Sequence, residues 1–471
     1  MIQWGVCMFD LIQNINAALN AVIWGPYMLL LLLGVGVFYT VKLKCFQFVY
    51  FKMWWKNTAM AIFRKNYTDS KHAGISPLQA MSTALAGSIG TGNIVGVANA
   101  IAMGGPGAVF WMWIAAFFGM ATVFAENVLG VKYRKEKNGR FVGGPMYYIE
   151  SGLGYKPLAV IFAVLCTAAS LGMGNMTQSN SVAGALKNGF GVPTEISGII
   201  LSFLVLIIIL GGISRIARLT EMLVPAMTIL FILGILIVIA FHFDKIPSAF
   251  YSIVNHAFDM KSAAGGFMGY GMSRALKYGI SRGVFSNEAG LGSSPIVHAA
   301  TDTDNPYLQG MWGIFQVFID TIVLCTLMAL CILTSDGVQL GLDGIELSTY
   351  SFQTVLGSFG HIFISLSIIL FAFGTLVSWS YYGERSLEYL TNGKYIIVYR
   401  LFYAGITFIG CVTGISFVWE ISDTLNGLMA IPNLIALILL SRKVQLKECL
   451  SIYHAKFSLK TQKKTKKLLL K

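Results

Sequence analysis

The sequence predicts an all-α integral membrane protein with 11 transmembrane helices: one extra N-terminal helix, followed by a 5+5 inverted repeat with two broken helices. Only 12% of its 471 residues are charged and 56% are hydrophobic, whereas soluble domains carry about 25% charged residues. Uncharged runs such as 222–241 reach the roughly 20 residues that a helix needs to cross a bilayer. Two apolar segments are interrupted by glycine-rich stretches, GSIGTGNIVG at 87–96 and FSNEAGLGSSP at 285–295.

We expect the eleven spans at about 21–41, 78–102, 108–132, 157–187, 196–212, 219–241, 267–300, 308–333, 361–390, 396–418 and 421–440. Before them, Phe9–Trp24 has apolar residues at helical spacing and predicts a helix on the outer membrane interface. Between the first two spans, the aromatic and lysine-rich segment Cys45–Phe63 predicts an interfacial helix on the cytoplasmic side. The connections Phe243–Gly266, with a short amphipathic piece, and Asp336–Glu346 are expected outside.

Three regions follow from this reading of the chain. Residues 1–76 hold the two interfacial helices and the first span, and residues 77–441 form the core. The core divides into a first half at about 77–241 and a second half at about 266–441, and residues 442–471 form a basic cytoplasmic tail.

The positive charge of the chain is concentrated in a few segments. The net charge of +13 raises the question of nucleic-acid binding, but the basic residues crowd Lys42–Lys71, Lys132–Lys156 and the tail after Arg442. Once the spans are threaded these segments lie on one side, which is the positive-inside pattern of membrane proteins. We therefore expect no nucleic-acid partner, an N-terminus outside, a C-terminus in the cytoplasm, and a location in a prokaryotic inner membrane.

Neither the cysteines nor the N-terminus indicates another class of protein. The seven cysteines are scattered without a C-x-x-C pair, so no zinc site, other transition-metal site or disulfide framework is predicted. The first basic residue is Lys42, whereas a secretory signal begins with basic residues. The N-terminal segment is therefore expected to stay in the protein.

The stretch GSIGTGNIVG allows three interpretations. A phosphate-binding loop is disfavoured because no alternating strand precedes it and no lysine follows. Close helix packing is the plain alternative for small residues in a membrane helix. We favour a helix that unwinds in the bilayer, because Thr91 and Asn93 offer partners to freed backbone groups. An unsatisfied backbone group costs several kcal/mol in lipid, so such a break must line a cavity.

The two glycine-rich stretches occupy the second and the seventh predicted spans. They are five spans apart, and because five is odd, the halves that they open face opposite sides of the membrane. Broken helices in corresponding positions of two inverted halves are the best sequence indication of a transporter's binding site. The halves have no obvious sequence identity, so this repeat rests on hydropathy and on the position of the breaks.

Several segments of the chain resemble those of a known family. The segments STALAGSIGTGNIVGVANAIAMGGPGAVFWMWIAAFFG, FVGGPMYY, GNMTQSNSVAGAL, ISRGVFSNEAGLGSSPIVHAA and WSYYGE are similar to those of the alanine or glycine:cation symporters, the sodium:alanine symporter family. The resemblance runs from about Trp24 to Leu440. It implies the inverted-repeat fold of the bacterial leucine transporter with one extra helix in front, no enzymatic activity or cofactor, and uptake of alanine or glycine with Na⁺, or in some members H⁺, by a monomer.

The resemblance also implies a substrate site. Backbone N–H groups of Thr91 and Gly92 would bind the substrate carboxylate. Side chains would line the rest of the site, with Gln178 as a hydrogen-bonding group, Phe285 as a cap, Ser286 beside the substrate ammonium and Trp379 as a wall. Bulky rings in a pocket otherwise built of small residues favour a short substrate, although discrimination by one methylene is only about 1–3 kcal/mol and serine is expected to pass as well.

A cation site is implied next to it. Asn93 would give a side-chain oxygen, and a second site would use the carbonyls of Ala86 and Ile89 with the Thr375 hydroxyl. Gly374 stands where serine is common in the family, which would weaken that second site. Asp320 is predicted from the sequence itself, because a charge in mid-span costs at least about 2.5–3.5 kcal/mol and is expected near the ion or as a proton carrier.

The remaining charged residues and the histidine of the spans are expected to have local partners. Glu288 is expected to pair with Arg282 in a structural or gating role, Glu126 with a basic loop, and His298 to be a hydrogen-bonded residue at a helix end. Two alternatives to sodium symport stay open: a proton-coupled transporter of small amino acids and, less favoured, a passive channel. A membrane enzyme is disfavoured because the spans contain no acidic motif or histidine pair for a metal.

Overall fold

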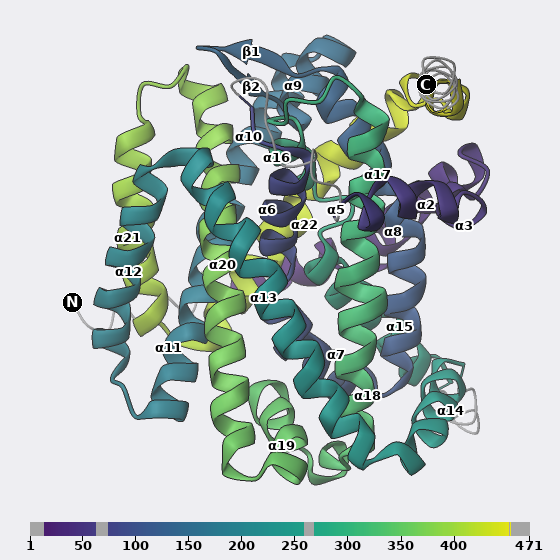
Figure 1. The fold of residues 1–471 in the computed structure, drawn as a ribbon, viewed down its shortest axis with the longest axis vertical. Helices are drawn as coiled ribbons and strands as arrows, with labels where there is room; N and C mark the ends of the chain where they lie inside the picture. The colour runs from purple at the N-terminus through teal and green to yellow at the C-terminus, as the bar shows by residue number, and fades with distance from the viewer. Residues whose placement is uncertain (1–13, 63–73, 259–267, 452, 454–471) are drawn as a thin grey trace, which may run out of the picture.

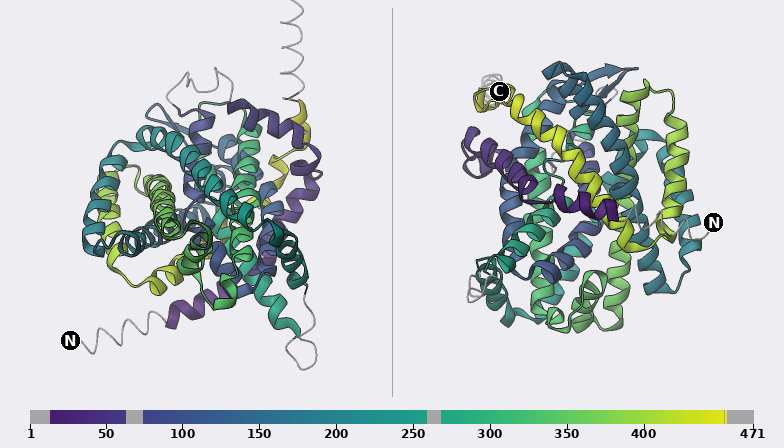
Figure 2. Two further views of the ribbon diagram at one scale, coloured as in Figure 1. Left: turned by 60° about the horizontal axis from the view of Figure 1, so that its bottom comes forward. Right: turned by 180° about the vertical axis from the view of Figure 1, so that it is seen from behind.

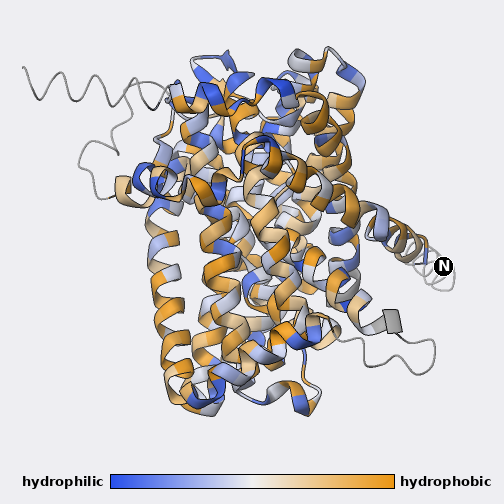
Figure 3. Ribbon diagram, turned by 90° about the vertical axis from the view of Figure 1, so that its right-hand side faces the viewer, coloured by the Kyte–Doolittle hydropathy of each residue, from blue (hydrophilic) through white to orange (hydrophobic). Residues whose placement is uncertain are grey.

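The computed structural model describes residues 14–62, 74–258, 268–451 and 453. Nearly all of them are helical, and the strands of this part of the chain are β1 (Lys135–Lys137) and β2 (Arg140–Val142), which pair antiparallel. Figure 1 shows this hairpin at one end of the molecule, called the hairpin end below. Helices α14 (Ile246–Ala257) and α19 (Gly344–Leu356) lie at the opposite end. Hydrophilic residues gather at these two ends and hydrophobic residues along the helices between them (Figure 3).

Helices of different lengths lie between the two ends. They are α2 (Pro26–Lys42), α8 (Gly107–Lys132), α10 (Lys156–Leu171), α11 (Thr177–Phe190), α12 (Thr194–Leu210), α13 (Gly212–Phe241), α17 (Pro306–Val317), α18 (Thr326–Thr334), α20 (Ser358–Thr391), α21 (Ile396–Val412) and α22 (Ile415–Leu439). Seven stretches of the described chain are long and apolar enough to cross a membrane: Asn14–Lys42, Gly107–Lys132, Lys156–Phe190, Gly212–Phe241, Pro306–Thr334, Ser358–Thr391 and Val418–Leu439. The protein is therefore a mostly helical membrane protein.

The four remaining predicted spans are not among these seven because each lacks a long continuous apolar helix. Helices α12 and α21 are apolar but have only 17 residues each. The spans predicted at 78–102 and 267–300 are helices interrupted in the middle, so neither offers one long apolar segment.

The first interrupted helix consists of α6 (Pro77–Ser88), a 3₁₀ turn η1 (Thr91–Asn93) and α7 (Val95–Gly104). Its start is well capped, because the Ser76 and Gln79 side chains exchange hydrogen bonds with each other's backbone N–H. At Gly90 the backbone leaves the helix with φ −133° and ψ −149°. The predicted break at the glycine-rich stretch is thus present.

The second interrupted helix consists of α15 (Met268–Asn287) and the short α16 (Ser294–His298). Between them Gly290 and Gly292 have φ of +90° and +81°, a region that only glycine adopts readily. Glu288 also has a positive φ, +59°. In Figure 1 the first interrupted helix runs from the hairpin end towards α19, and the second runs from the α14 end towards the hairpin.

Two further helices contain wide, π-helical turns, which are frequent at functional sites. The turn η3 (Gly172–Met176) separates α10 from α11, and η5 (Phe318–Cys325) separates α17 from α18. Gln178 is the second residue after the first turn, and Asp320 lies in the second. Both predicted site residues therefore stand where the helix changes its winding.

The smaller elements complete the ends of the molecule. They are α9 (Pro145–Tyr148), η2 (Ile149–Leu153), η4 (Phe243–Lys245), η6 (Gly337–Leu340) and η7 (Ser441–Lys443). The expected amphipathic piece of 243–266 is α14, which packs against α8. The single interfacial helix expected at 45–63 is instead three short ones, α3 (Phe46–Val49), α4 (Phe51–Asn57) and α5 (Ala59–Ile62). It is divided because the backbone leaves the helical conformation at Tyr50 and Thr58.

Part of the predicted N-terminal helix and most of the predicted basic tail lie outside the described residues. Residues 14–23 are helical and reach α2 through a turn at Trp24 and Gly25. Seen from behind in Figure 2, the yellow-green helix α22 runs obliquely past this purple N-terminal segment, and α2 and α22 are in contact.

Candidate substrate and cation site

The two helix breaks lie directly against each other. A Cβ atom on Gly92 would stand 3.2 Å from Cα of Ser286 and 3.3 Å from a ring carbon of Phe285. Real Cβ atoms rarely approach other atoms so closely, so only glycine leaves the first break this close to the second. Three residues predicted for the substrate site are thereby brought together.

The backbone of the first break finds polar partners only in part. The N–H of Gly90 donates to Oδ1 of Asn93 at 3.1 Å, and the N–H of Thr91 donates to Oε1 of Gln178 at 3.4 Å. The Thr91 hydroxyl is fully buried and has no hydrogen-bond partner among the described residues. Buried polar groups are normally paired, so this hydroxyl indicates a place for a ligand.

Asp320 connects the two breaks. Its Oδ1 accepts a hydrogen bond from Nδ2 of Asn93 at 2.9 Å, and its Oδ2 accepts from the hydroxyls of Ser286 at 2.9 Å and Thr321 at 2.8 Å. Asp320 is fully buried and forms no ion pair within the described part of the chain. A carboxylate held by neutral donors alone leaves its charge uncompensated, which a bound cation would correct.

Contrary to the prediction, the side-chain oxygen of Asn93 is not free for an ion. Its side-chain oxygen, expected to face an ion, accepts the Gly90 N–H, and its amide nitrogen faces the Asp320 carboxylate. The reason is that the unwound turn leaves a backbone N–H within reach, and the nearest side-chain acceptor takes it.

Helix α20 closes the first break from the other side. The Thr375 hydroxyl donates to the Ala86 carbonyl at 2.9 Å and to that of Phe371 at 3.2 Å, and a Cβ on Gly90 would stand 2.5 Å from this hydroxyl. A Cβ on Gly374 would lie 3.8 Å from the Ala86 oxygen. Thr375 and Ala86 are thus adjacent, as the predicted second cation site requires, and Ile89 is buried at the end of α6.

The prediction that Glu288 pairs with Arg282 is wrong. Glu288 accepts a hydrogen bond from Trp379 Nε1 at 2.7 Å and another from the Ser293 hydroxyl. Arg282 lies within α15, whereas Glu288 follows its last residue and has a positive φ, so the backbone no longer continues the helix and directs the Glu288 side chain away from Arg282. Trp379, predicted as a wall of the site, is therefore fixed to the second break.

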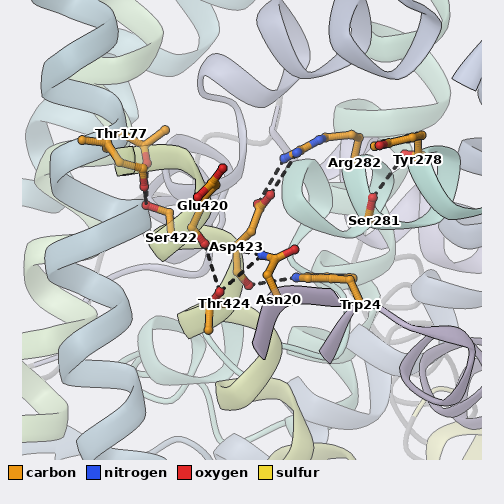
Figure 4. A network of polar contacts seen from close by, with 11 residues as sticks. Asn20, Trp24, Thr177, Tyr278, Ser281, Arg282, Glu420, Ser422, Asp423 and Thr424 are labelled. Atoms are coloured by element: carbon orange, nitrogen blue, oxygen red, sulfur yellow. Dashed lines mark hydrogen bonds and ion pairs between the residues drawn. The ribbon is translucent and has the colours of Figure 1, made fainter. Parts of the chain in front are cut away.

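Arg282 instead forms a two-pronged ion pair with Asp423 of α22, at 2.9 and 3.1 Å (Figure 4). Beside it the rings of Phe285 and Trp419 stack with centroids 5.2 Å apart. The Arg282 guanidinium lies 5.7 and 5.5 Å from these two ring centroids. A charged layer and an aromatic layer thus join α15 to α22 on the side of the break that leads to α14.

The N-terminal segment that precedes α2 is hydrogen-bonded to α22 beside the Arg282–Asp423 pair. Trp24 donates from Nε1 to the backbone oxygen of Asp423 at 2.9 Å, and Asn20 donates to the Thr424 hydroxyl at 3.3 Å (Figure 4). Sequence reasoning missed Trp419 and Asp423. The signal was present, because Glu420 and Asp423 are two acids at the start of the last predicted span, 421–440.

The prediction that Glu126 pairs with a basic loop is also wrong. Glu126 is fully buried, and its Oε1 accepts hydrogen bonds from the Gly292 N–H at 3.1 Å and from Asn433 Nδ2 at 2.6 Å. Asn433 also donates to the Gly290 carbonyl at 2.9 Å and accepts from the Tyr148 hydroxyl. The interrupted backbone of the second break leaves the Gly292 N–H without a partner in its own helix. Glu126 accepts this N–H and therefore faces the break and not a basic loop.

The site residues are closed to solvent on both sides. Thr91, Asp320 and Trp379 have no exposed surface, and Phe285 is 3% exposed. The buried His298 ends α16 and is hydrogen-bonded to the Gln309 side chain, as predicted. The arrangement is a buried polar junction between two interrupted helices.

Comparison with known proteins identifies the family of the chain. Residues 9–467 match the sodium:alanine symporter family. The chain is 43% identical, over 92% of its length and 95% of the relative, to the sodium/alanine symporter AgcS of Methanococcus maripaludis. It is 39% identical to the probable sodium/glutamine symporter GlnT of Bacillus subtilis, over 93% and 90% of the two chains.

The crystal structure of MhsT in complex with L-phenylalanine shares the fold, with a TM-score of 0.58 at 14% identity over 78% of this chain and 89% of that one. The relatives are transporters and not enzymes. The chain belongs to the sodium:alanine symporter family.

Proposed function

We propose that this protein is a sodium-coupled symporter that imports small neutral amino acids, alanine or glycine or both, by alternating access. The observation that carries the proposal is the contact of the two helix breaks around Asp320, a buried carboxylate with only neutral hydrogen-bond donors. A cation bound there neutralises the carboxylate, and the exposed backbone groups of the breaks bind the two charged ends of an amino acid.

The substrate site in this proposal uses the residues predicted from the sequence. The turn η1 just before α7, with the Thr91 and Gly92 amides, faces the substrate carboxylate, because helix N-termini carry partial positive charge. The C-terminal end of α15, near Phe285 and Ser286, faces the ammonium. The Thr91 hydroxyl without a partner supports this place for the carboxylate, and Gln178 supplies a further hydrogen-bonding group.

The aromatic walls support a short substrate side chain. Phe285 is stacked on Trp419, and Trp379 is tied to Glu288. Rings held in this way do not move aside easily, so a long side chain has no room. The name of the sodium/glutamine relative makes glutamine the informative larger substrate to test against alanine.

We assign two cation positions. One uses Asp320 together with Ser286 and an Asn93 side chain that releases the Gly90 N–H when the ion binds. The other uses the Ala86 and Ile89 carbonyls and the Thr375 hydroxyl. Each Na⁺ that enters down a membrane potential of 100 mV supplies about 2.3 kcal/mol, which supports a roughly fortyfold accumulation at about 1.4 kcal/mol per factor of ten.

Alternating access then opens one closing layer at a time. The Arg282–Asp423 pair closes the route to the α14 end, which we assign to the outside together with the N-terminus. The Glu126–Asn433–Tyr148 cluster closes the route to the basic hairpin end, which we assign to the cytoplasm. The opposite directions of the two interrupted helices (Figure 1) support a 5+5 inverted repeat. With it we propose eleven spans and a monomer in the inner membrane.

Uptake by proteoliposomes tests the proposal. Vesicles with the purified protein receive labelled alanine, with Na⁺ outside, with Na⁺ on both sides, or with a proton gradient alone. Accumulation above the external concentration only under the inward Na⁺ gradient is expected. Accumulation under the proton gradient alone would make the protein a proton-coupled transporter, and equilibration without accumulation under every condition would make it a passive channel. Competition by unlabelled glycine, serine and glutamine defines the substrate size.

A further inference from the structure

A cavity of about 370 Å³ lies at the hairpin end, away from the substrate site. It is bounded by the β1–β2 hairpin, α9, η2, the beginning of α10 and the end of α20. The lining residues that matter below are Lys135, Lys137, Tyr147, Glu150, Lys156 and Tyr389. None of the residues predicted to bind substrate or cation lines this cavity, so transport does not account for it.

The charge of the lining is positive. Three ammonium groups, of Lys135, Lys137 and Lys156, face one carboxylate, that of Glu150. Lys135 lies 3.6 Å from Glu150 and is paired with it. Within the described ranges of the chain no carboxylate pairs with Lys137 or Lys156. Two cationic groups in a concave site are therefore left without a counter-charge, which suits an anion with one or two negative charges.

A buried hydroxyl in the same cavity also lacks a partner. Tyr147 is 1% exposed, and its hydroxyl accepts and donates no hydrogen bond among the described residues. Burial above all, and next the charge of Glu388, raises the pKa of Tyr147 well above its usual range. The hydroxyl thus keeps its proton and is a donor. Buried donors are nearly always satisfied, and this one belongs to a residue that lines the cavity, so an acceptor bound there is the partner that the proposal below assigns to it.

A phosphate group has the chemistry that meets these demands. It carries the charge that two ammonium groups neutralise, and its several oxygens accept from lysine and hydroxyl donors at the same time. Lys137 and Tyr147 are held close together, with the ammonium 5.8 Å from the ring centroid. A carboxylate ligand would have only two oxygens for these donors, which come from the hairpin, α9 and α10.

We propose that this cavity is a binding site for a phosphate group. Two sources bring that chemistry to a basic membrane surface: the head group of an anionic phospholipid, which basic clusters attract, and a free phosphate anion. The site joins α10, which continues through η3 to Gln178, to α20, which carries Thr375 and Trp379. A bound phosphate therefore stabilises the contact between these helices at the hairpin end.

The test measures thermal unfolding of the full-length protein by its intrinsic fluorescence, at constant Na⁺ and constant ionic strength. In one arm the protein in detergent receives inorganic phosphate. In the other it sits in nanodiscs in which phosphatidylglycerol replaces phosphatidylcholine step by step. An increase of the midpoint with inorganic phosphate identifies a site for a free anion, and an increase with phosphatidylglycerol alone identifies a lipid head group. No increase in either arm overturns the proposal.

Variants assign the effect to this cavity. Tyr147→Phe removes only the unpaired hydroxyl, so the protein without phosphate is expected to unfold at the same temperature or slightly higher. Its half-saturating phosphate or lipid concentration is expected to rise about tenfold, the effect of losing one hydrogen bond to a charged group. The Lys137→Gln/Lys156→Gln double variant is expected to lose the effect entirely.

Lys447→Gln is the matched control, because Lys447 is an exposed lysine of the C-terminal region that does not line the cavity. It is expected to respond to phosphate and lipid like the unaltered protein. If Tyr147→Phe and the double lysine variant also respond like the unaltered protein, the anion binds elsewhere and the proposal is wrong. The readout is independent of transport, so loss of alanine uptake alone would leave this inference standing.

Discussion

Asn93 donates a hydrogen bond from Nδ2 to Oδ1 of Asp320 across 2.9 Å. This contact joins the break of the first interrupted helix to the π-helical turn η5. On the same carboxylate the Ser286 hydroxyl brings in the second interrupted helix. One buried carboxylate is therefore hydrogen-bonded to both breaks, and a change of its charge affects both.

Asp320→Asn tests this role directly. The amide keeps the size of the side chain but removes the charge that a cation would neutralise. We expect Na⁺-driven alanine uptake to fall at least about a hundredfold, since a lost charge contact in a buried site is worth roughly 2–5 kcal/mol. The unaltered protein should be stabilised against heat by Na⁺, and the variant should not. A variant that keeps this stabilisation would move the cation away from Asp320.

Gly92→Ala tests the contact of the two breaks. The added methyl group would stand 3.2 Å from Cα of Ser286, and overpacking of this kind costs about 1–3 kcal/mol. We expect a lower unfolding temperature and alanine uptake close to background. Gly184→Ala in α11 is the control, because its Cβ meets nothing within 4 Å, and it should be neutral or slightly stabilising. Equal behaviour of the two variants would contradict the close approach.

The Arg282–Asp423 pair is expected to act as the closing contact on the α14 side. Its side chains are only 13% and 16% exposed. A single charge reversal therefore places two like charges side by side in a mostly buried position, without a counter-charge. We expect Arg282→Asp and Asp423→Arg each to reduce alanine uptake about tenfold or more, equivalent to about 1.4 kcal/mol. The double exchange should recover part of it, as a double-mutant cycle of uptake rates would measure. Purely additive losses would exclude direct coupling.

Phe285→Leu tests the size limit of the pocket. The leucine keeps an apolar cap but cannot stack on Trp419, as the Phe285 ring does at 5.2 Å. We expect the ratio of alanine to glutamine uptake to fall by roughly tenfold, because pocket walls discriminate by about 1–3 kcal/mol per methylene. Competition of labelled alanine by unlabelled glutamine measures this ratio. An unchanged ratio would mean that another wall limits the substrate.

The positions of the helices could be predicted from the sequence because their causes are local. Each predicted span is helical in the described structure, and both breaks lie at the glycine-rich stretches, since only glycine enters the φ of +90° and +81° found at Gly290 and Gly292. The segment 45–63 was predicted less well. It is divided into three short helices at Tyr50 and Thr58. Trp54 Nε1 donates to the Gln47 carbonyl across the first division, a contact that hydropathy does not reveal.

The sequence by itself determined that the chain is a helical membrane protein with two interrupted helices and which residues stand at the breaks. Only the tertiary structure decided the partners of the charged groups: Asp423 for Arg282, Trp379 for Glu288, and the Gly292 amide for Glu126. The physical reason is that helical winding and hydropathy depend on neighbours along the chain. The partner of a buried charge depends instead on which distant helix packs beside it, and Arg282 and Asp423 are 141 residues apart.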